Sequence, residues 1–201
     1  MKPAGCCSVR NAMPIQGVVL FPGAGSNRDH AALIAIENSL TPLPVLRVDF
    51  PYRKAGKKFP DTAPVLVQCV KDEVRRFAAD IGCTTADLVI GGRSMGGRMC
   101  TMAVADTQDA LQVAGVVCIG YPLHPPKKPD QLRIAHLPQM TARALFVSGT
   151  RDEFGTPAEL GDAFALLPAP PLVHLIDGGR HELLGHDEHV ATLIRQWLQT
   201  L

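Results

Sequence analysis

Short runs of apolar and β-branched residues recur along the chain, each followed by a turn signal and then by a stretch with helical spacing. Runs such as VVL, LVIGG, VAGVVCIG and ALFVSG are typical of strands that are buried on both faces of a parallel sheet. We therefore expect a doubly wound α/β sheet with helices on both sides. The predicted strands are Gly17–Phe21, Pro44–Asp49, Asp87–Gly91, Val113–Gly120, Ala144–Ser148 and Leu172–Ile176. The predicted helices are Asp29–Ser39, Ala63–Ile81, Met95–Asp106, Pro157–Leu166 and His186–Gln199.

The length of 201 residues fits one domain with its own core and is too short for two domains of ordinary size. We expect a flexible tail over residues 1–15 and one domain over residues 16–201. Lys and Arg number 20 against 19 Asp and Glu, so the charge excess that usually accompanies nucleic-acid binding is missing. No apolar run approaches the ~20 residues that span a bilayer, and the first residues lack a signal-peptide core. We expect a cytoplasmic protein with neither nucleic acid nor membrane as a partner.

The cysteines show no C-x-x-C spacing of the kind that holds zinc. We therefore expect no metal site and mostly reduced thiols. Cys100 and Cys118 lie in apolar segments, where free cysteine serves as a small core residue. The adjacent pair Cys6 and Cys7 has two interpretations, a lipidation or redox site and a frayed tail.

The most informative motif is Gly92-Arg93-Ser94-Met95-Gly96, a G-x-S-x-G between an apolar strand and a helical pattern. A serine on so sharp a turn needs glycine two residues away on each side, because side chains there would collide with neighbouring backbone. We predict that Ser94 is a nucleophile; the alternative is an ordinary serine helix cap. The following helix directs its N-terminal amides at the reacting centre, which makes the Met95 amide an oxyanion donor.

An acid and a histidine follow in the order that this type of site requires. Asp152 comes after the strand Ala144–Ser148, and His181 comes after the strand Leu172–Ile176 through a Gly-Gly turn. We predict that Asp152 orients the imidazole so that its second nitrogen faces the serine hydroxyl. Glu153 is the rival for the acid. A metal site that uses His181 with two histidines of the last helix lacks a ligand motif.

The loop Leu20–Asn27 carries glycines where backbone must approach a ligand, and in this arrangement it donates the second oxyanion amide. We choose Ala24 as that donor, with Gly25 as the alternative. A phosphate-binding loop is the competing interpretation. The segment matches neither of the glycine-rich nucleotide-binding patterns, so we expect no cofactor.

Two irregular segments, Tyr52–Asp61 and Tyr121–Gln139, follow strand ends where an open α/β sheet binds its ligands. Their Arg and Lys content favours an anionic acyl substrate. Arg93 has a second interpretation, in which it pairs with an acidic neighbour and anchors the turn. The candidate substrate-binding residues are Tyr52, Arg53, Arg93, Tyr121 and His124.

The segments PGAGSNRDH, VDFPYR, GGRSMGGR, GYPLHPPKKPDQLR and LFVSGTRDEFGT together resemble one known family. It is the compact α/β-hydrolase-like family of bacterial dienelactone-hydrolase-type proteins and of animal testis-expressed and histone-acetyltransferase-complex hydrolase-like proteins. The resemblance covers nearly the whole chain from Gly17. It implies a three-layer α/β-hydrolase fold with a minimal, mostly parallel sheet of about six strands and no cap domain. It also places Ser94, Asp152 and His181 at the triad positions. Pro22 departs from the family, which usually carries histidine before the Gly-Ala-Gly loop.

These features predict a serine hydrolase that cleaves a small-molecule carboxylic ester or thioester through an acyl-enzyme, without a cofactor. One alternative is a non-catalytic binding module that keeps the fold with an idle triad. The other is peptidase or acyltransferase activity on the same triad. We expect a monomer or a homodimer, and in a dimer the chains would pair through an exposed edge strand Gly17–Phe21 or the Pro-rich loop.

Overall fold

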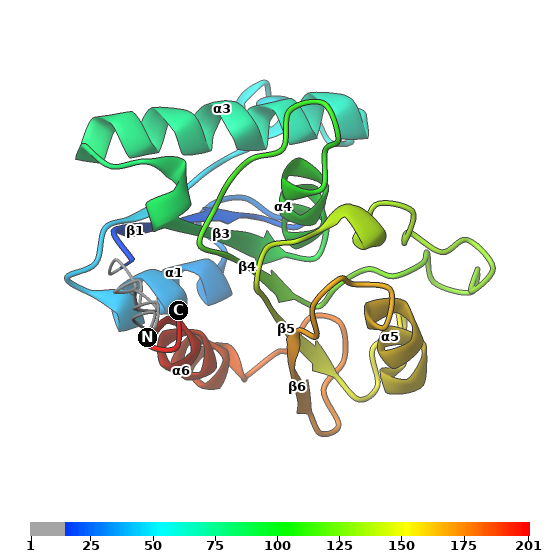
Figure 1. Cartoon of the computed structure of the whole chain (residues 1–201). Helices are drawn as coiled ribbons and strands as arrows, with labels where there is room; N and C mark the ends of the chain where they lie inside the picture. The colour runs from blue at the N-terminus through cyan, green and yellow to red at the C-terminus, as the bar shows by residue number, and fades with distance from the viewer. Residues whose placement is uncertain (1–14) are drawn as a thin grey trace, which may run out of the picture.

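Six parallel strands form one sheet in the order β2-β1-β3-β4-β5-β6 (Figure 1). The computed structural model describes residues 15–201, so the expectations for Cys6, Cys7 and all of the tail except Ile15 lie outside the described residues. The strand order changes direction between β1 and β3, and ligands of open α/β sheets bind in the crevice at such a switch point. The strands are β1 Gly17–Phe21, β2 Val45–Arg47, β3 Leu88–Arg93, β4 Gly115–Ile119, β5 Ala144–Gly149 and β6 Leu172–Ile176.

Helices cover both faces of this sheet, which confirms the predicted three-layer fold (Figure 1). Helices α1 (Ala31–Leu40) and α6 (Asp187–Leu198) pack together on one face. Helices α3 (Ala63–Ile81), α4 (Met95–Val104) and α5 (Pro157–Phe164) contribute to the core on the other. The shorter elements are α2 (Pro51–Lys54) and two single 3₁₀ turns, η1 (Thr85–Asp87) and η2 (Leu137–Gln139).

Strand β1 shows how one apolar run supplies both cores. Val18 and Leu20 pack into the cluster beneath α1 and α6, whereas Val19 and Phe21 pack into the cluster beneath α3, α4 and α5. All four side chains are fully buried because successive strand residues point to opposite, helix-covered faces. The unbroken apolar runs in the sequence follow from this double burial.

Two sequence-based expectations about the elements were wrong. Strand β1 does not lie at an edge, because β2 and β3 pair with it on its two sides. The edge strands are β2 and β6. The segment that begins at Tyr52 was expected to be irregular, but Pro51 stands at the first position of the short helix α2, where proline is favoured.

The described residues hold four free thiols, and Cys100 and Cys118 are buried in the core as predicted. Burial raises the pKa of the Cys118 thiol well above its ordinary value. Across residues 15–201, no cluster of three or more His, Cys, Asp or Glu side chains is arranged to hold a metal ion. None of the helices in that range is both long and apolar enough to cross a bilayer.

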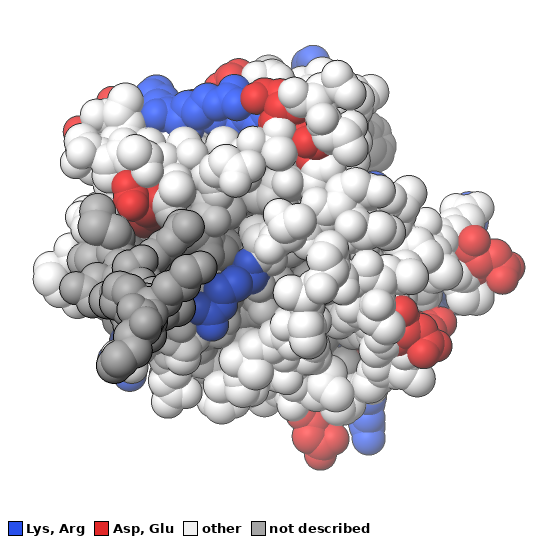
Figure 2. Space-filling view, in the orientation of Figure 1, with Lys and Arg blue, Asp and Glu red and all other residues white. Residues whose placement is uncertain are grey.

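Charged side chains of both signs gather over α3, along the top of the face in Figure 2. Several of them form ion pairs there, including Arg76 with Glu73 and Asp80, at 2.6 and 2.7 Å. Lys71 points inward from the same helix and is only 3% exposed, but its ammonium lies 2.6 Å from a carboxylate oxygen of Asp106. This face of α3 is therefore largely neutralised by its own neighbours.

Candidate active site

The turn between β3 and α4 holds Ser94 in a backbone conformation that only a tightly packed structure maintains. Its φ of 49° and ψ of −117° lie outside the regions that a non-glycine residue normally occupies. A Cβ atom added at Gly92 or Gly96 would lie 2.1 or 2.3 Å from the carbonyl oxygen of Phe21. Both glycines are therefore required by the close approach of β1, and they let the serine stand above the sheet edge.

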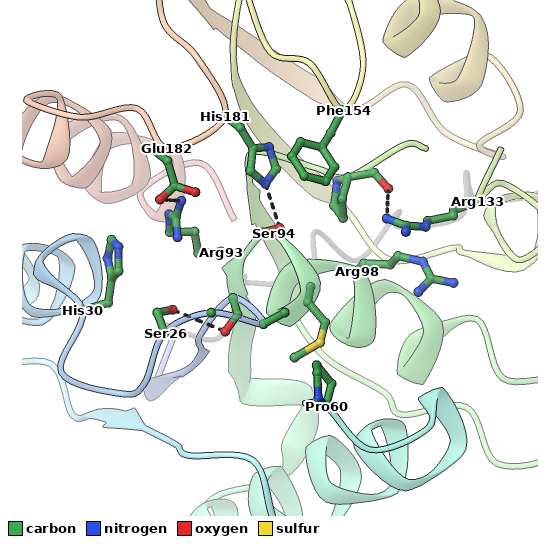
Figure 3. A pocket seen from close by; sticks show the side chains of 15 residues that line it. Ser26, His30, Pro60, Arg93, Ser94, Arg98, Arg133, Phe154, His181 and Glu182 are labelled. Atoms are coloured by element: carbon green, nitrogen blue, oxygen red, sulfur yellow. Dashed lines mark hydrogen bonds and ion pairs between the residues drawn. The ribbon is translucent and has the colours of Figure 1, made fainter. Parts of the chain in front are cut away.

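Two later strands bring the acid and the histidine to this serine, and Figure 3 shows His181 hydrogen-bonded to Ser94. Asp152 follows β5 and His181 follows β6, and the two residues are 2% and 4% exposed. His181 Nδ1 lies 3.0 Å from both carboxylate oxygens of Asp152, and His181 Nε2 lies 2.8 Å from Ser94 Oγ. Because a carboxylate only accepts hydrogen bonds, Nδ1 carries the proton and Nε2 accepts from the serine hydroxyl. Ser94 and Asp152 are 58 positions apart in the sequence, and Asp152 and His181 are 29 positions apart, yet the three side chains form one hydrogen-bonded chain.

Phe154 supports two members of this chain, Asp152 and His181, a role that the sequence analysis missed. Its backbone amide donates to Asp152 Oδ1 over 2.8 Å, and its ring stacks on the His181 imidazole with centroids 3.9 Å apart. Stacking and the amide together restrict the orientation of both partners. Glu153, the rival acid, is exposed.

An ion pair links the residue before Ser94 to the residue after His181. The guanidinium of Arg93 contacts the carboxylate of Glu182, and Arg93 is 4% exposed. This is the second of the two interpretations proposed for Arg93, although the residue also borders the cavity. The pair ties the turn that carries Ser94 to the loop that carries His181.

Helix α2 holds the glycine loop that follows β1. Tyr52 Oη donates to the carbonyl oxygen of Ala24, and Arg53 Nε donates to the carbonyl oxygen of Ser26, each over 2.9 Å. Neither side chain lines the cavity that holds Ser94; both reach into the loop to bond its backbone. Met95 is the first residue of α4, where the amide has no acceptor within the helix.

Two other substrate-binding candidates are also part of the supporting structure. Tyr121 is 1% exposed and donates its hydroxyl hydrogen bond to the carbonyl oxygen of Arg133 over 2.9 Å. His124 is 5% exposed, and its Nδ1 lies 2.9 Å from the carbonyl oxygen of Pro125. Neither lines the cavity, because each is turned toward the loop backbone that surrounds it.

Ser94 and His181 border a cavity of about 650 Å³ at the switch point of the sheet (Figure 3). Ala24 and Met95, the predicted oxyanion donors, both border it next to Ser94. Both irregular loops reach the cavity, but through residues that the sequence analysis did not select. These residues are Pro60, Pro122 and Arg133, to which α4 adds Arg98.

The model of an alpha/beta hydrolase domain matches residues 15–200. The chain belongs to the alpha/beta hydrolase family. This match, together with a dienelactone hydrolase among the similar solved structures, agrees with the resemblance to the compact branch of the family that the sequence shows. In keeping with a compact member, the connection from β4 to β5 contains only the turn η2 as regular structure among the described residues.

Solved structures of other alpha/beta hydrolases share the fold at low sequence identity. A serine hydrolase homologue from Coxiella burnetii is 15% identical with a TM-score of 0.73, covering 94% of this chain and 88% of that one. A dienelactone hydrolase from Anabaena variabilis is 21% identical with a TM-score of 0.70, at the same coverage. The protein Est1E from Butyrivibrio proteoclasticus is 14% identical with a TM-score of 0.72, covering 96% and 90%. At these identities the likeness establishes only the fold of this chain.

Proposed function

We propose that this alpha/beta hydrolase is a serine hydrolase that cleaves a carboxylic ester or thioester through an acyl-enzyme. The observation that carries the proposal is the continuous hydrogen bonding from Ser94 through His181 to Asp152, with distances of 2.8 and 3.0 Å. A nucleophile and base within hydrogen-bond reach, with a third group orienting the base, is the arrangement that activates a serine. A dienelactone hydrolase and a monoacylglycerol lipase among the structural neighbours lend support to an ester substrate.

In the first half of the reaction, Ser94 Oγ attacks the acyl carbon while His181 Nε2 takes the hydroxyl proton. The carbonyl π electrons move to oxygen, and the amides of Met95 and Ala24 donate hydrogen bonds to the resulting oxyanion. When the tetrahedral intermediate collapses, the bond to the alcohol or thiol breaks and His181 returns the proton to that leaving group. The acyl group is then esterified to Ser94.

In the second half, a water molecule replaces the leaving group and His181 removes one of its protons. The hydroxide oxygen attacks the acyl carbon, the bond to Ser94 Oγ breaks, and the serine regains its proton from His181. A carboxylic acid leaves. Asp152 stays ionised throughout and stabilises the imidazolium that forms twice in each cycle.

Hydrolysis of a panel of 4-nitrophenyl esters and acyl thioesters tests this proposal. The Ser94→Ala variant is expected to lose about a thousandfold or more of kcat, since the nucleophile makes the covalent bond. Ser39→Ala, a serine substitution on α1 away from the cavity, serves as the control and is expected to match the wild type. Equal turnover by Ser94→Ala and the wild type would contradict the assigned nucleophile.

Two further arms of the same assay separate the alternatives. Folded wild-type protein that turns over none of the panel would favour a non-catalytic binding module. Amide substrates and added alcohol acceptors report peptidase and acyltransferase activity on the same serine, because only the leaving group or the acceptor changes.

A further inference from the structure

Two arginines that the proposed mechanism does not use line one side of the active-site cavity, Arg98 from α4 and Arg133 from the connection between β4 and β5 (Figure 3). The Arg98 amide donates to the carbonyl oxygen of Ser94 over 3.1 Å, so Arg98 lies one helical turn after the nucleophile. Residues four apart share a face of a helix. Arg98 is therefore directed to the same side of α4 as the reacting serine.

Neither arginine has a carboxylate partner among residues 15–201. The Nε atom of Arg98 is buried and has no hydrogen-bond acceptor there, and the one side-chain bond of Arg133 runs from Nη1 to the carbonyl oxygen of Pro122 over 3.1 Å. The carboxylates beside the cavity are already engaged, Glu182 with Arg93 and Asp152 with His181. Other arginines of the chain, such as Arg47, pair with carboxylates.

The consequence is a local excess of positive charge that is partly removed from water. Desolvation lowers the pKa of Arg98 and of Arg133, and the charge of Arg98 lowers the pKa of Arg133 further. Guanidinium groups stay ionised under such shifts. Two neighbouring charges without a counter-ion are costly to the free protein, and an anionic ligand would relieve that cost.

The position of Arg133 is fixed before any ligand binds. Its amide donates to the carbonyl oxygen of Leu123 over 2.8 Å, and its own carbonyl oxygen accepts from Tyr121 Oη over 2.9 Å. With the side-chain bond to Pro122, this makes three attachments to residues 121–123. A guanidinium held in this way loses little conformational freedom when it binds an anion. A larger share of the free energy of the contact therefore contributes to binding affinity.

We propose that Arg98 and Arg133 form an anion subsite of the active-site cavity and that the substrate is an ester that carries a carboxylate. Guanidinium groups bind carboxylates through paired, charge-assisted hydrogen bonds, which a neutral chain of the same length does not offer. The hydrolytic part of this inference rests on the proposed function. The carboxylate belongs to the acyl half or to the leaving half of the ester, and the substrates below separate these two sources.

The kinetic test compares matched charged and neutral esters, with the uncatalysed rate subtracted. 4-Nitrophenyl hemiglutarate against 4-nitrophenyl valerate places the charge on the acyl half, and 3-acetoxybenzoate against phenyl acetate places it on the leaving half. We expect the wild type to favour one charged member by about 10-fold or more in kcat/KM. Arg98→Gln and Arg133→Gln should each lose about 10- to 100-fold on that member and stay within about 2-fold on its neutral match.

Further variants separate a binding role from a structural one. Arg98→Lys and Arg133→Lys keep the charge and should recover part of the activity on the charged ester. Arg195→Gln, an exposed arginine on α6 outside the cavity, should match the wild type on all four esters. Equal losses on charged and neutral esters in the Gln variants, or no preference in the wild type, would overturn the subsite.

Calorimetric binding of monomethyl glutarate to the Ser94→Ala protein tests the subsite without any chemistry. We expect binding that weakens about 10-fold or more when Arg98 or Arg133 is also changed to Gln. If the protein hydrolyses neutral esters but neither prefers the charged esters nor binds monomethyl glutarate, the subsite is refuted and the hydrolase proposal stands. Arginine-dependent binding without turnover of any ester would refute the hydrolase and leave the subsite intact.

Discussion

Gly96→Ala tests the close backbone packing at the start of α4, next to Ser94. An added Cβ would lie 2.3 Å from the carbonyl oxygen of Phe21 and 2.7 Å from that of Pro22, whereas ordinary contact begins at 3.4 Å. Because both neighbours are backbone atoms, the strand end must move by about 1 Å. Overpacking of this kind costs about 1–3 kcal/mol or more, against a gain of about 1 kcal/mol from the helix propensity of alanine. Because both clashes are with backbone atoms, we take the upper end of this cost, which leaves a net loss of about 2 kcal/mol.

Gly161→Ala is the matched control, because Gly161 is also helical but is exposed on α5 with no atom within 4 Å of the added Cβ. It should gain about 0.5–1 kcal/mol. The free energies of unfolding come from urea titrations followed by circular dichroism, and heating should show Gly96→Ala melting about 4–8 °C below the wild type. A Gly96→Ala protein as stable as the wild type, or one that gains stability as Gly161→Ala does, would refute the packing argument.

Three other perturbations test separate parts of the account. Asp152→Asn should lower kcat about 10³- to 10⁴-fold with the fold intact, because the amide favours the wrong tautomer of the histidine; steady-state kinetics near wild-type values would contradict this. Tyr52→Phe removes the hydrogen bond to Ala24 and should cost about 1 kcal/mol of stability together with a lower kcat at unchanged KM, measured by unfolding and kinetics. Burial, aided by the charge of Arg98, lowers the pKa of His136 from 6.5 to about 4. Because its folded-state pKa is depressed, the stability due to neutral His136 is complete above about pH 6.5 and is lost as the pH falls toward 4. His136→Asn should therefore flatten the dependence of unfolding free energy on pH in that window, and an unchanged slope would count against the assignment.

The layers of the fold and the serine turn were predictable because local sequence encodes them. Strands buried on both faces need unbroken apolar runs, and the turn at Ser94 needs glycine at positions 92 and 96 because β1 passes within contact distance. Strand order was not predictable in the same way. The sequence of β1 shows only that it is buried, and its place between β2 and β3 depends on pairing partners far along the chain.

The walls of the cavity were predicted less well than the placement of Ser94 next to His181 and Asp152, because loop residues face whichever segment packs against them. Tyr52 and Tyr121 are large polar residues in the expected loops, yet both point their hydroxyls at backbone carbonyls. Arg98 had a usable signal, since it lies four residues after Ser94 in a helical pattern. Arg133 had none, because its place in the cavity depends on contacts with residues 121–123.

The central claim is that Ser94 is the activated nucleophile, and mapping the adduct of a fluorophosphonate tests it most directly. Such reagents phosphonylate a serine hydroxyl only where a neighbouring base activates it. We predict that peptide mass spectrometry finds the adduct on the peptide that contains Ser94, and that His181→Ala abolishes it in otherwise folded protein. A folded wild-type protein that forms no adduct, or one that forms it on another residue, would contradict the account.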